Sequence, residues 1–276
     1  MSKVSISMPV YNGASTIGAA ISAVLGQTFD DFELIISDNG STDDTLQICE
    51  AAASRDPRIR IIRQAQNRGP IANFGAVLTA ARGSFFMFAA VDDRIEPHFV
   101  EETLAALEGA PDAVACAPRT LIHFTDGRTR EARGCRPIGL PGWLRPARFL
   151  LRPADNSRFY GLYRTAAMRA AYLGEERFHA FDWAVSALTL TQGTHLQSRS
   201  IVLHRHGAEP GKYNAEHRRS ASGWLHRLFP LAGMSAALLP RLTPGQRLLA
   251  IPALVLLNAR QSAEFLLAYA LGIPHR

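Results

Sequence analysis

Cysteine is scarce in this sequence, which has only Cys49, Cys116 and Cys135 among its 276 residues. An odd number of cysteines without metal-ligand spacing argues against a disulfide framework and against a zinc site. We also expect no export signal at the amino terminus, because residues 1–9 reach an alternating pattern and a proline too early for an apolar signal core. We therefore expect a protein of the reducing cytoplasm.

Two common phosphate-binding loops are missing as well. Gly13 and Gly18 have the spacing of a P-loop, but Ala19 and Ala20 stand where a lysine and a hydroxyl residue must reach phosphate and magnesium. No Gly-x-Gly-x-x-Gly follows the first expected strand, which disfavours a dinucleotide-binding Rossmann domain. A nucleotide would have to be held in another way.

Apolar runs long enough to cross a membrane are absent, since residues 248–257 and 265–271 both fall short of about 20 residues. The hydrophobic content of 47% is still ample for a globular core. A net charge of +6 favours phosphate-bearing substrates, nucleic acid or an anionic membrane face. We do not expect nucleic acid, because aromatic and basic residues are not interleaved.

Strand and helix patterns alternate along the first 118 residues, which is typical of parallel β-α-β units and predicts an α/β fold. We expect strands at 4–10, 32–37, 58–62, 84–91 and 113–117, with helices at 14–25, 44–54, 71–81 and up to about 107. The regular pattern is lost over 119–153, which we interpret as specificity loops. Order returns at 158–164, in a helix at 182–191 and in a strand at 194–204.

The most informative segment is the apolar run Phe85–Val91, which leads directly into Asp92 and Asp93. Such a run is typical of a central parallel strand that is buried on both faces. Adjacent carboxylates at its carboxyl end lie where open α/β sheets bind ligands, and their oxygens suit Mg2+ or Mn2+ carrying phosphate groups. The alternative is that Asp92 caps the next helix and Asp93 is a solvated turn residue.

After Tyr213 the sequence changes to Leu- and Ala-rich segments separated by prolines, which predicts a helical extension over residues 214–276. This extension mixes apolar anchors with cations, as an interfacial amphipathic helix does, at Trp224, His226, Arg227, Phe229 and Arg241. Two interpretations stay open, a contact with a membrane surface and packing on the rest of the chain or on a homodimer partner.

Four segments in order resemble family 2 of the glycosyltransferases, namely VSISMPVYN at 4–12, ISDNGSTD at 36–43, NRG at 67–69 and AVDD at 90–93. The resemblance covers roughly residues 3–210 and implies a GT-A fold, which is a Rossmann-like, mostly parallel sheet flanked by helices. It divides residues 1–213 into a nucleotide-sugar-binding half, 1–118, and an acceptor-binding and catalytic-base half, 119–213.

The resemblance also implies an activity. A member of this family is an inverting enzyme that moves a sugar from a nucleotide-diphosphate donor, here a UDP-sugar, to a hydroxyl of a glycan or lipid-linked acceptor. Mn2+ or Mg2+ is the implied cofactor. Surface polysaccharide or lipopolysaccharide biosynthesis at the cytoplasmic face of the membrane is the implied setting.

Carried over to this sequence, the resemblance places the nucleotide sugar against Pro9, Val10, Tyr11, Asn12, Asp38, Asn67, Arg68 and Asp92. Residues 9–11 would form the wall against which the base packs, and Asp38 would accept a hydrogen bond from a base N–H. Without the resemblance, Tyr11 would be an ordinary strand end and Asp38 part of an Asx turn.

The metal and the catalytic base are assigned in the same way. Asp93 is the implied metal ligand, and His206, which follows an arginine, lies near the diphosphate and metal in similar proteins. Asp182 is the implied base, since it opens a helix and precedes an aromatic residue, although it could equally be a helix N-cap. Residues 156–164 resemble the acceptor floor.

Two other functions stay open. Ala90 stands where many members carry a further acid, so the chain could be a catalytically weakened domain that binds nucleotide sugar. A nucleotidyltransferase also uses acidic metal sites at strand ends, but it needs a basic loop after the first strand, and residues 11–16 contain no Lys or Arg.

Overall fold

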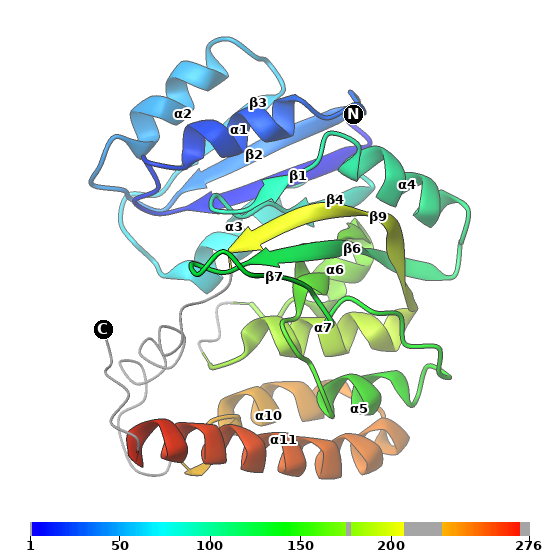
Figure 1. Cartoon of the computed structure of the whole chain (residues 1–276). Coiled ribbons are helices and arrows are strands. Elements are labelled where there is room, and N and C mark those ends of the chain that lie inside the picture. The colour runs from blue at the N-terminus through cyan, green and yellow to red at the C-terminus, as the bar shows by residue number, and fades with distance from the viewer. Residues whose placement is uncertain (1, 175–177, 207–227, 271–276) are drawn as a thin grey trace.

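The structure is a computed structural model that describes residues 2–174, 178–206 and 228–270. One nine-stranded sheet runs through these residues in the order β3-β2-β1-β4-β8-β6-β9-β5, with β7 paired to β6 outside this path (Figure 1). The strands are β1 (Val4–Val10), β2 (Phe32–Asp38), β3 (Ile59–Arg63), β4 (Phe85–Phe88), β5 (Arg94–Ile95), β6 (Ala113–His123), β7 (Thr129–Glu131), β8 (Leu162–Arg164) and β9 (Thr194–His206).

Helices cover both faces of this sheet, which confirms the predicted α/β class. They are α1 (Ile17–Leu25), α2 (Thr45–Ala53), α3 (Pro70–Ala80), α4 (Phe99–Glu108), α5 (Arg145–Leu150), α6 (Thr165–Ala171), α7 (Phe181–Gln192), α10 (Ala232–Leu238) and α11 (Pro244–Ala270), with short 3-10 turns at η1 (Ser157–Tyr160) and η2 (Leu239–Arg241).

The first four strands of the path are parallel, as the β-α-β pattern predicts. Val10 at the end of β1 pairs with Asp38 at the end of β2, and β4 pairs with the first part of β1. Antiparallel strands enter with β8, which lies between β4 and β6. The carboxyl ends of β1, β2 and β4 therefore meet at one edge, where open sheets of this kind bind ligands.

Two sequence-based boundaries are wrong. The acid-ended strand stops at Phe88 rather than Val91, because after Ala89 N–H donates to Ser7 O at 2.8 Å the chain turns toward Asp92. Regular structure is not lost after Pro118 either, since β6 continues to His123. The β6–β9 register shifts on both sides of Pro118, where a proline without an N–H is tolerated.

Two hydrophobic clusters fill the two sides of the sheet. One joins α1 and α4 to the side chains of β1, β2 and β4 that point toward them, such as Ile6, Leu34 and Met87. The other joins α3, α5, α6 and α7 to Phe86 and Phe88 of β4. Strand β4 thus contributes large side chains to both clusters, as its uninterrupted apolar sequence predicts.

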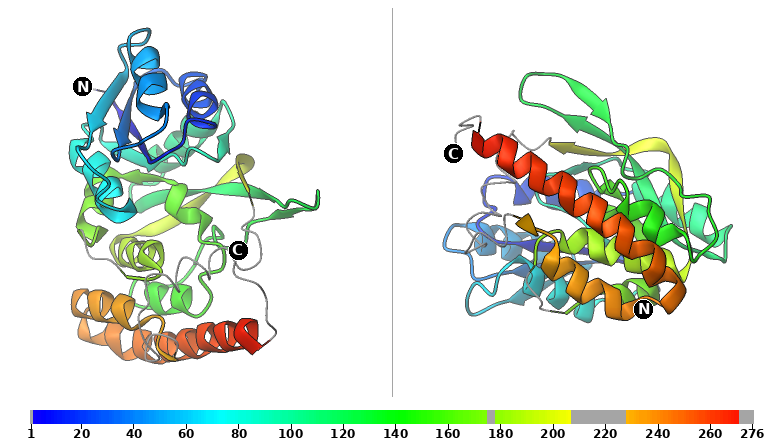
Figure 2. Two further views of the ribbon diagram at one scale, coloured as in Figure 1. Left: turned by 90° about the vertical axis from the view of Figure 1, so that its left-hand side faces the viewer. Right: turned by 90° about the horizontal axis from the view of Figure 1, so that it is seen from below.

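The carboxyl-terminal helices form the layer farthest from β1 to β3 (Figure 2). Ala250, Leu254 and Leu257 of α11 are buried in the cluster that includes α5 and α7. The opposite face of α11 exposes Leu248 and Val255, which are 74% and 63% accessible. No helix in the described ranges is long and apolar enough to span a bilayer. Trp224, His226 and Arg227 lie outside the described residues.

Candidate functional site

The nucleotide-side residues of the sequence prediction meet where β1 and β2 end. Asn39 N–H donates to Val10 O at 2.9 Å, which holds the two strand ends together. Asp38 is buried, and its Oδ2 accepts from Ser41 N–H at 3.2 Å, while its Oδ1 has no hydrogen-bond partner within the described residues. A buried carboxylate oxygen without a partner is costly, so Asp38 Oδ1 is a candidate acceptor for a donor from a ligand that reaches it.

The loops after β1 and β2 are joined by Asn12. Its backbone is left-handed with φ 50°, its N–H donates to Ser41 Oγ at 2.9 Å, and its Oδ1 accepts from Thr42 N–H at 2.8 Å. Pro9 and Val10 are half-buried and buried in β1, whereas Tyr11 is 45% exposed at the mouth of these loops. Asn12, which the sequence predicts to contact the nucleotide, therefore also holds the loops after β1 and β2 together.

A third loop is attached to the same edge through Asn39. Its side-chain amide donates to Asn67 Oδ1 at 3.0 Å and to Gly69 O at 3.2 Å, and its Oδ1 accepts from Arg68 N–H at 3.0 Å. Gly69 has φ 90°, a conformation that a residue with a Cβ rarely adopts. The Asn-Arg-Gly loop is therefore placed beside Asp38, with the Arg68 side chain exposed.

Asp92 and Asp93 differ sharply in their surroundings. Asp92 is exposed, and the helix that follows is capped by His98, so the interpretation of Asp92 as its cap is wrong. The Asp93 side chain is only 6% exposed, and Arg205 Nε donates to its Oδ2 at 3.1 Å. Burial raises the pKa of the Asp93 carboxyl to about 6, an increase that the charge of Arg205 opposes and that of Asp92 reinforces.

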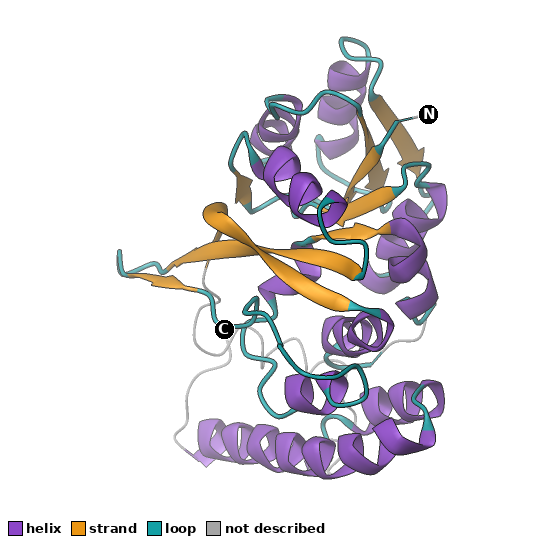
Figure 3. Cartoon of the chain, turned by 90° about the vertical axis from the view of Figure 1, so that its right-hand side faces the viewer, coloured by secondary structure: helices purple, strands orange, loops and turns teal. Residues whose placement is uncertain are grey.

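Arg205 reaches Asp93 because β5 pairs with the end of β9, where Arg94 is opposite His204. The long paired strands β6 and β9 extend across the molecule, and the last residues of β9 include Arg205 (Figure 3). The Arg205 guanidinium lies 4.4 Å from the centroid of the Tyr160 ring and within 3.5 Å of Ser157 Oγ. From the His-Arg-His segment at 204–206 the sequence predicted His206 as the functional residue, whereas the residue that contacts Asp93 is Arg205.

Asp182 faces the same cation from α7. Asn156 Nδ2 donates to Asp182 Oδ2 at 2.8 Å, and the charge of Arg205 also acts on this carboxyl. Burial raises the pKa of Asp182, while the bond from Asn156 opposes that increase. The N-cap of α7 is Ala180 and not Asp182, so the helix-cap alternative is wrong.

The backbone around Asp182 is unusual. Ala180 and Asn156 both have left-handed conformations, with φ 61° and 45°. Neither is glycine, so each conformation costs on the order of 1 kcal/mol and persists only where the surroundings enforce it. Such strain concentrates at functional sites, and here it positions the acid and the amide that holds it.

His206 ends β9 and is exposed, and its charge is close enough to act on Asp93. Within the described ranges, no three or more His, Cys, Asp or Glu side chains gather in a group that could hold a metal ion. Arg158, in the segment that resembles the acceptor floor, is buried and bonded to main-chain carbonyls of Gly134 and Arg136. It is therefore not exposed to a substrate in this conformation.

Comparison with known proteins gives the same family. The sequence model of glycosyl transferase family 2 matches residues 5–174. The Bacillus subtilis protein EpsH is 37% identical over 131 residues, which are 47% of this chain and 37% of EpsH. The chain thus spans little more than a third of that relative's length. Because the family match covers well over half of the chain, the chain belongs to glycosyltransferase family 2.

Solved structures share the fold. S. aureus TarS 1-349 in complex with UDP-GlcNAc has a TM-score of 0.60 at 17% identity, covering 99% of this chain and 93% of that one. The Pyrobaculum calidifontis mannosyltransferase PcManGT in complex with GDP-Man and Mn2+ has a TM-score of 0.63 at 16% identity, covering 98% and 76%. These similarities confirm the predicted GT-A architecture.

Proposed function

We propose that this member of glycosyltransferase family 2 transfers a sugar, with inversion, from a UDP-sugar to a hydroxyl of a glycan or lipid-linked acceptor. The observation that carries this proposal is that Arg205 is paired with Asp93 at the nucleotide edge and also acts electrostatically on Asp182 of α7. A donor-side acid and an acceptor-side acid around one cation are what a single displacement at an anomeric carbon needs.

On the donor side, the edge between β1 and β2 would hold the nucleotide. Asp38 Oδ1 would accept from the base, Tyr11 with Pro9 and Val10 would pack against its plane, and the loop of Asn67 and Arg68 would close over it. Asp92, which is exposed, would contact the ribose. The complex of TarS with UDP-GlcNAc supports a UDP-sugar, whereas that of PcManGT with GDP-Man makes a guanine nucleotide the alternative to test.

A divalent metal ion fits the donor set in part. Asp93 offers carboxylate oxygens and His206 an imidazole nitrogen, which are ligands that suit Mn2+, and the diphosphate oxygens would complete the coordination. A bound ion would supply positive charge to offset that of the departing diphosphate. The complex of PcManGT with Mn2+ supports this assignment.

On the acceptor side, Asp182 would act as the base. Its carboxylate would take the proton of the acceptor hydroxyl as that oxygen forms a bond to the anomeric carbon. The bond from the anomeric carbon to the diphosphate oxygen breaks, and the nucleoside diphosphate leaves with the electron pair. Asn156 would hold Asp182 in place, and Arg205 would stabilise the charge that develops on the diphosphate.

The setting belongs to the proposal as well. We place the enzyme at the cytoplasmic face of a membrane in surface polysaccharide or lipopolysaccharide biosynthesis. The support is the exposed apolar face of α11, whose Leu248 and Val255 lie on one side at helical spacing. We assign residues 1–213 to the transferase domain and 214–276 to the extension that makes this contact or a homodimer contact.

A thermal-shift panel of nucleotide sugars, each with and without Mn2+, tests the function. The proposal predicts that one nucleotide sugar stabilises the protein, that Mn2+ increases the effect and that nucleoside diphosphate is released. If a nucleotide sugar stabilises the protein but no nucleoside diphosphate is released when cell extracts that contain acceptor are added, a weakened binding domain is favoured. Release of pyrophosphate from a nucleoside triphosphate and a sugar phosphate would favour a nucleotidyltransferase.

A further inference from the structure

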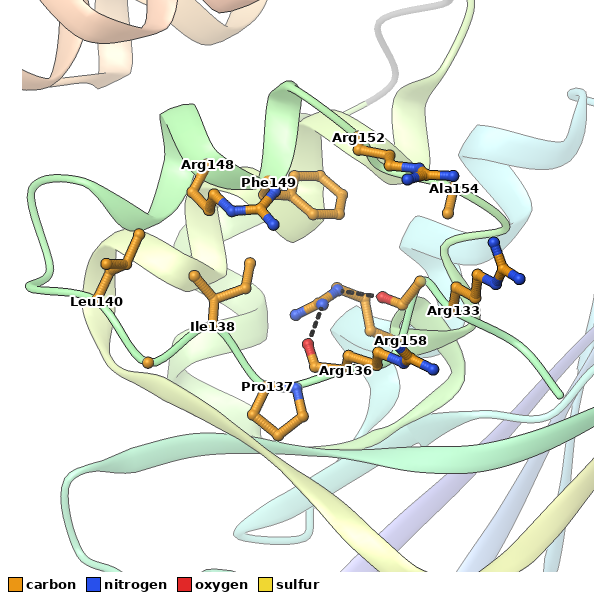
Figure 4. A pocket seen from close by; sticks show the side chains of 12 residues that line it. Arg133, Arg136, Pro137, Ile138, Leu140, Arg148, Phe149, Arg152, Ala154 and Arg158 are labelled. Carbon is orange, nitrogen blue, oxygen red and sulfur yellow. Dashed lines mark hydrogen bonds between the residues drawn. The ribbon is translucent and has the colours of Figure 1, made fainter.

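Two adjoining pockets open beside the acceptor half of the protein, with volumes of about 430 and 860 Å3. Both include Arg133, Arg152 and Ala154 in their walls, so they adjoin at these residues, and we treat them as one depression. We call this depression the arginine groove, because six exposed arginines line it: Arg130, Arg133, Arg136, Arg148, Arg152 and Arg260. Figure 4 shows Arg148 of α5 facing the 133–138 segment across the opening.

The charge of the groove is poorly neutralised. The smaller pocket has no Asp or Glu in its wall. The larger one has two acids in its wall. Asp155 is already used, since it accepts from Arg133 N–H, Gly134 N–H and Ser157 Oγ, and lies 3.6 Å from Arg130. Glu264 accepts from Gln261 Nε2 at 2.9 Å, so two carboxylates face the six exposed arginines of the groove. Among the described residues, no hydrogen bond or ion pair is formed by the side chains of Arg133, Arg148 and Arg152.

A buried cation strengthens the field from below. Arg158 lies in the floor of the smaller pocket, where its guanidinium donates to Gly134 O at 2.7 Å and Arg136 O at 2.8 Å (Figure 4). Burial lowers the pKa of Arg158, and none of its hydrogen bonds is to a carboxylate. Carbonyl oxygens hold this charge in place without cancelling it, so the floor remains positive.

The groove begins next to the proposed base. Trp183 and Asp155 line the larger pocket, Trp183 follows Asp182 in α7, and Asp155 precedes Asn156, which bonds Asp182. Asp182 itself is not among the residues that line the two pockets, so we base the course of the acceptor from Asp182 into the groove on these two chain neighbours. The groove is large enough for several groups of such an acceptor, and arginines line both of its pockets.

We infer that the arginine groove binds phosphate groups carried by the acceptor. Planar guanidinium groups bind phosphate oxygens with two parallel hydrogen bonds, and unpaired arginines around a groove favour a ligand with several negative charges over a neutral glycan. This inference rests on the proposed function only in calling the ligand an acceptor. Phosphodiesters within a glycan and the diphosphate of a lipid carrier share this chemistry, and the experiment separates them.

The test is calorimetric titration of inorganic tripolyphosphate into three full-length proteins: wild type, Arg133→Gln with Arg152→Gln, and a matched control, Arg55→Gln with Arg82→Gln. The control removes the same charge at exposed arginines outside the groove. We expect the groove pair to bind about tenfold more weakly or worse, as the loss of two charge-assisted contacts implies, and the control pair to match wild type. Equal weakening in both pairs would overturn the inference, because net charge alone would explain it.

Two further titrations identify the source of the phosphate. If only the groove pair loses affinity for a soluble glycerol phosphate oligomer, the ligand is a glycan with phosphodiesters. If only the groove pair loses affinity for phosphatidylcholine vesicles that carry a prenyl diphosphate, the ligand is the diphosphate of a lipid carrier. An oligogalacturonate that binds as tightly as the phosphate probes at equal charge would overturn the assignment to phosphate. Binding only to phosphatidylglycerol vesicles would make the groove a membrane contact instead. No probe is a nucleotide sugar, so failure here is distinct from failure of the donor test.

Discussion

Asn156 and Asp182 form a hydrogen bond of 2.8 Å between an amide on a strained backbone and a carboxylate at the start of α7. The amide favours the charged form of Asp182, whereas burial favours the neutral form. A base must be charged to accept a proton, so this contact tunes the group that the proposal places in the reaction. Substitutions at the two positions should therefore have different effects.

Asp182→Asn should lower kcat by about a hundredfold or more while donor affinity survives, because a base acts in the transition state and contributes little to ground-state binding. Initial rates of nucleoside diphosphate release, with calorimetry of donor binding, provide the measurement. Near-normal turnover in the folded variant would mean that another group removes the proton.

Asn156→Gly keeps the left-handed backbone and removes the amide, so the pKa of Asp182 should rise further. Because the protonated acid is inactive as a base, the acidic limb of the kcat profile should move to higher pH. The rate at high pH should recover to near the wild-type value. A uniform loss of rate at every pH would indicate that Asn156 affects the rate by a route other than the pKa of Asp182.

His195 should make the fold sensitive to acid. It is fully buried, Arg158 Nη1 is 3.2 Å from its Nδ1, and its Nε2 has no hydrogen-bond partner within the described residues. Burial lowers the pKa of His195 well below 6.5 in the folded state, so the unfolded state binds the proton first as pH falls.

This contribution to stability is complete above the unfolded pKa of 6.5 and is lost as the pH falls below it. Between about pH 7 and about pH 5 it should reduce the free energy of unfolding by about 2 kcal/mol. His195→Gln should lose less over the same range. Urea unfolding of both proteins at the two pH values tests this, and identical pH dependence would exclude His195 as the cause.

Substitutions on the exposed face of α11 should distinguish a membrane contact from a homodimer contact. Leu248→Gln with Val255→Gln removes apolar area without touching the buried side of the helix. If α11 contacts a membrane, co-sedimentation with anionic vesicles in low salt should fall, because the buried apolar area is smaller. A lower oligomeric mass of the variant, with unchanged vesicle binding, would instead identify a dimer face.

The sequence could predict the residues whose place is set by one strand. Val10, Asp38 and the Asp92–Asp93 pair end or follow apolar strands, and parallel strands bring their carboxyl ends together. The contact between Asp93 and Arg205 joins residues 112 positions apart in the sequence. It depends on the pairing of β9 with β5, and β5 has only two residues and therefore no periodic signal. Local pattern cannot indicate such a partner.

The sequence pattern did not predict the part of β6 after Pro118, for a different reason. Proline and the bulged register around it remove the alternation that identifies a strand, although β6 continues. The arginines of 119–153 were visible in the sequence, but only the fold brings Arg133 and Arg136 opposite Arg148 and Arg152. Their spacing along the chain does not predict one groove.

Calorimetry of UDP binding, with and without Mn2+, to wild type and to Asp93→Asn shows whether the donor diphosphate and a metal ion bind at Asp93. Wild type should bind UDP with an affinity that Mn2+ increases by about tenfold or more, and the variant should lose this increase because a carboxylate ligand is gone. Equal affinity for UDP in both proteins, with the same response to Mn2+, would contradict the placement of the donor diphosphate at Asp93.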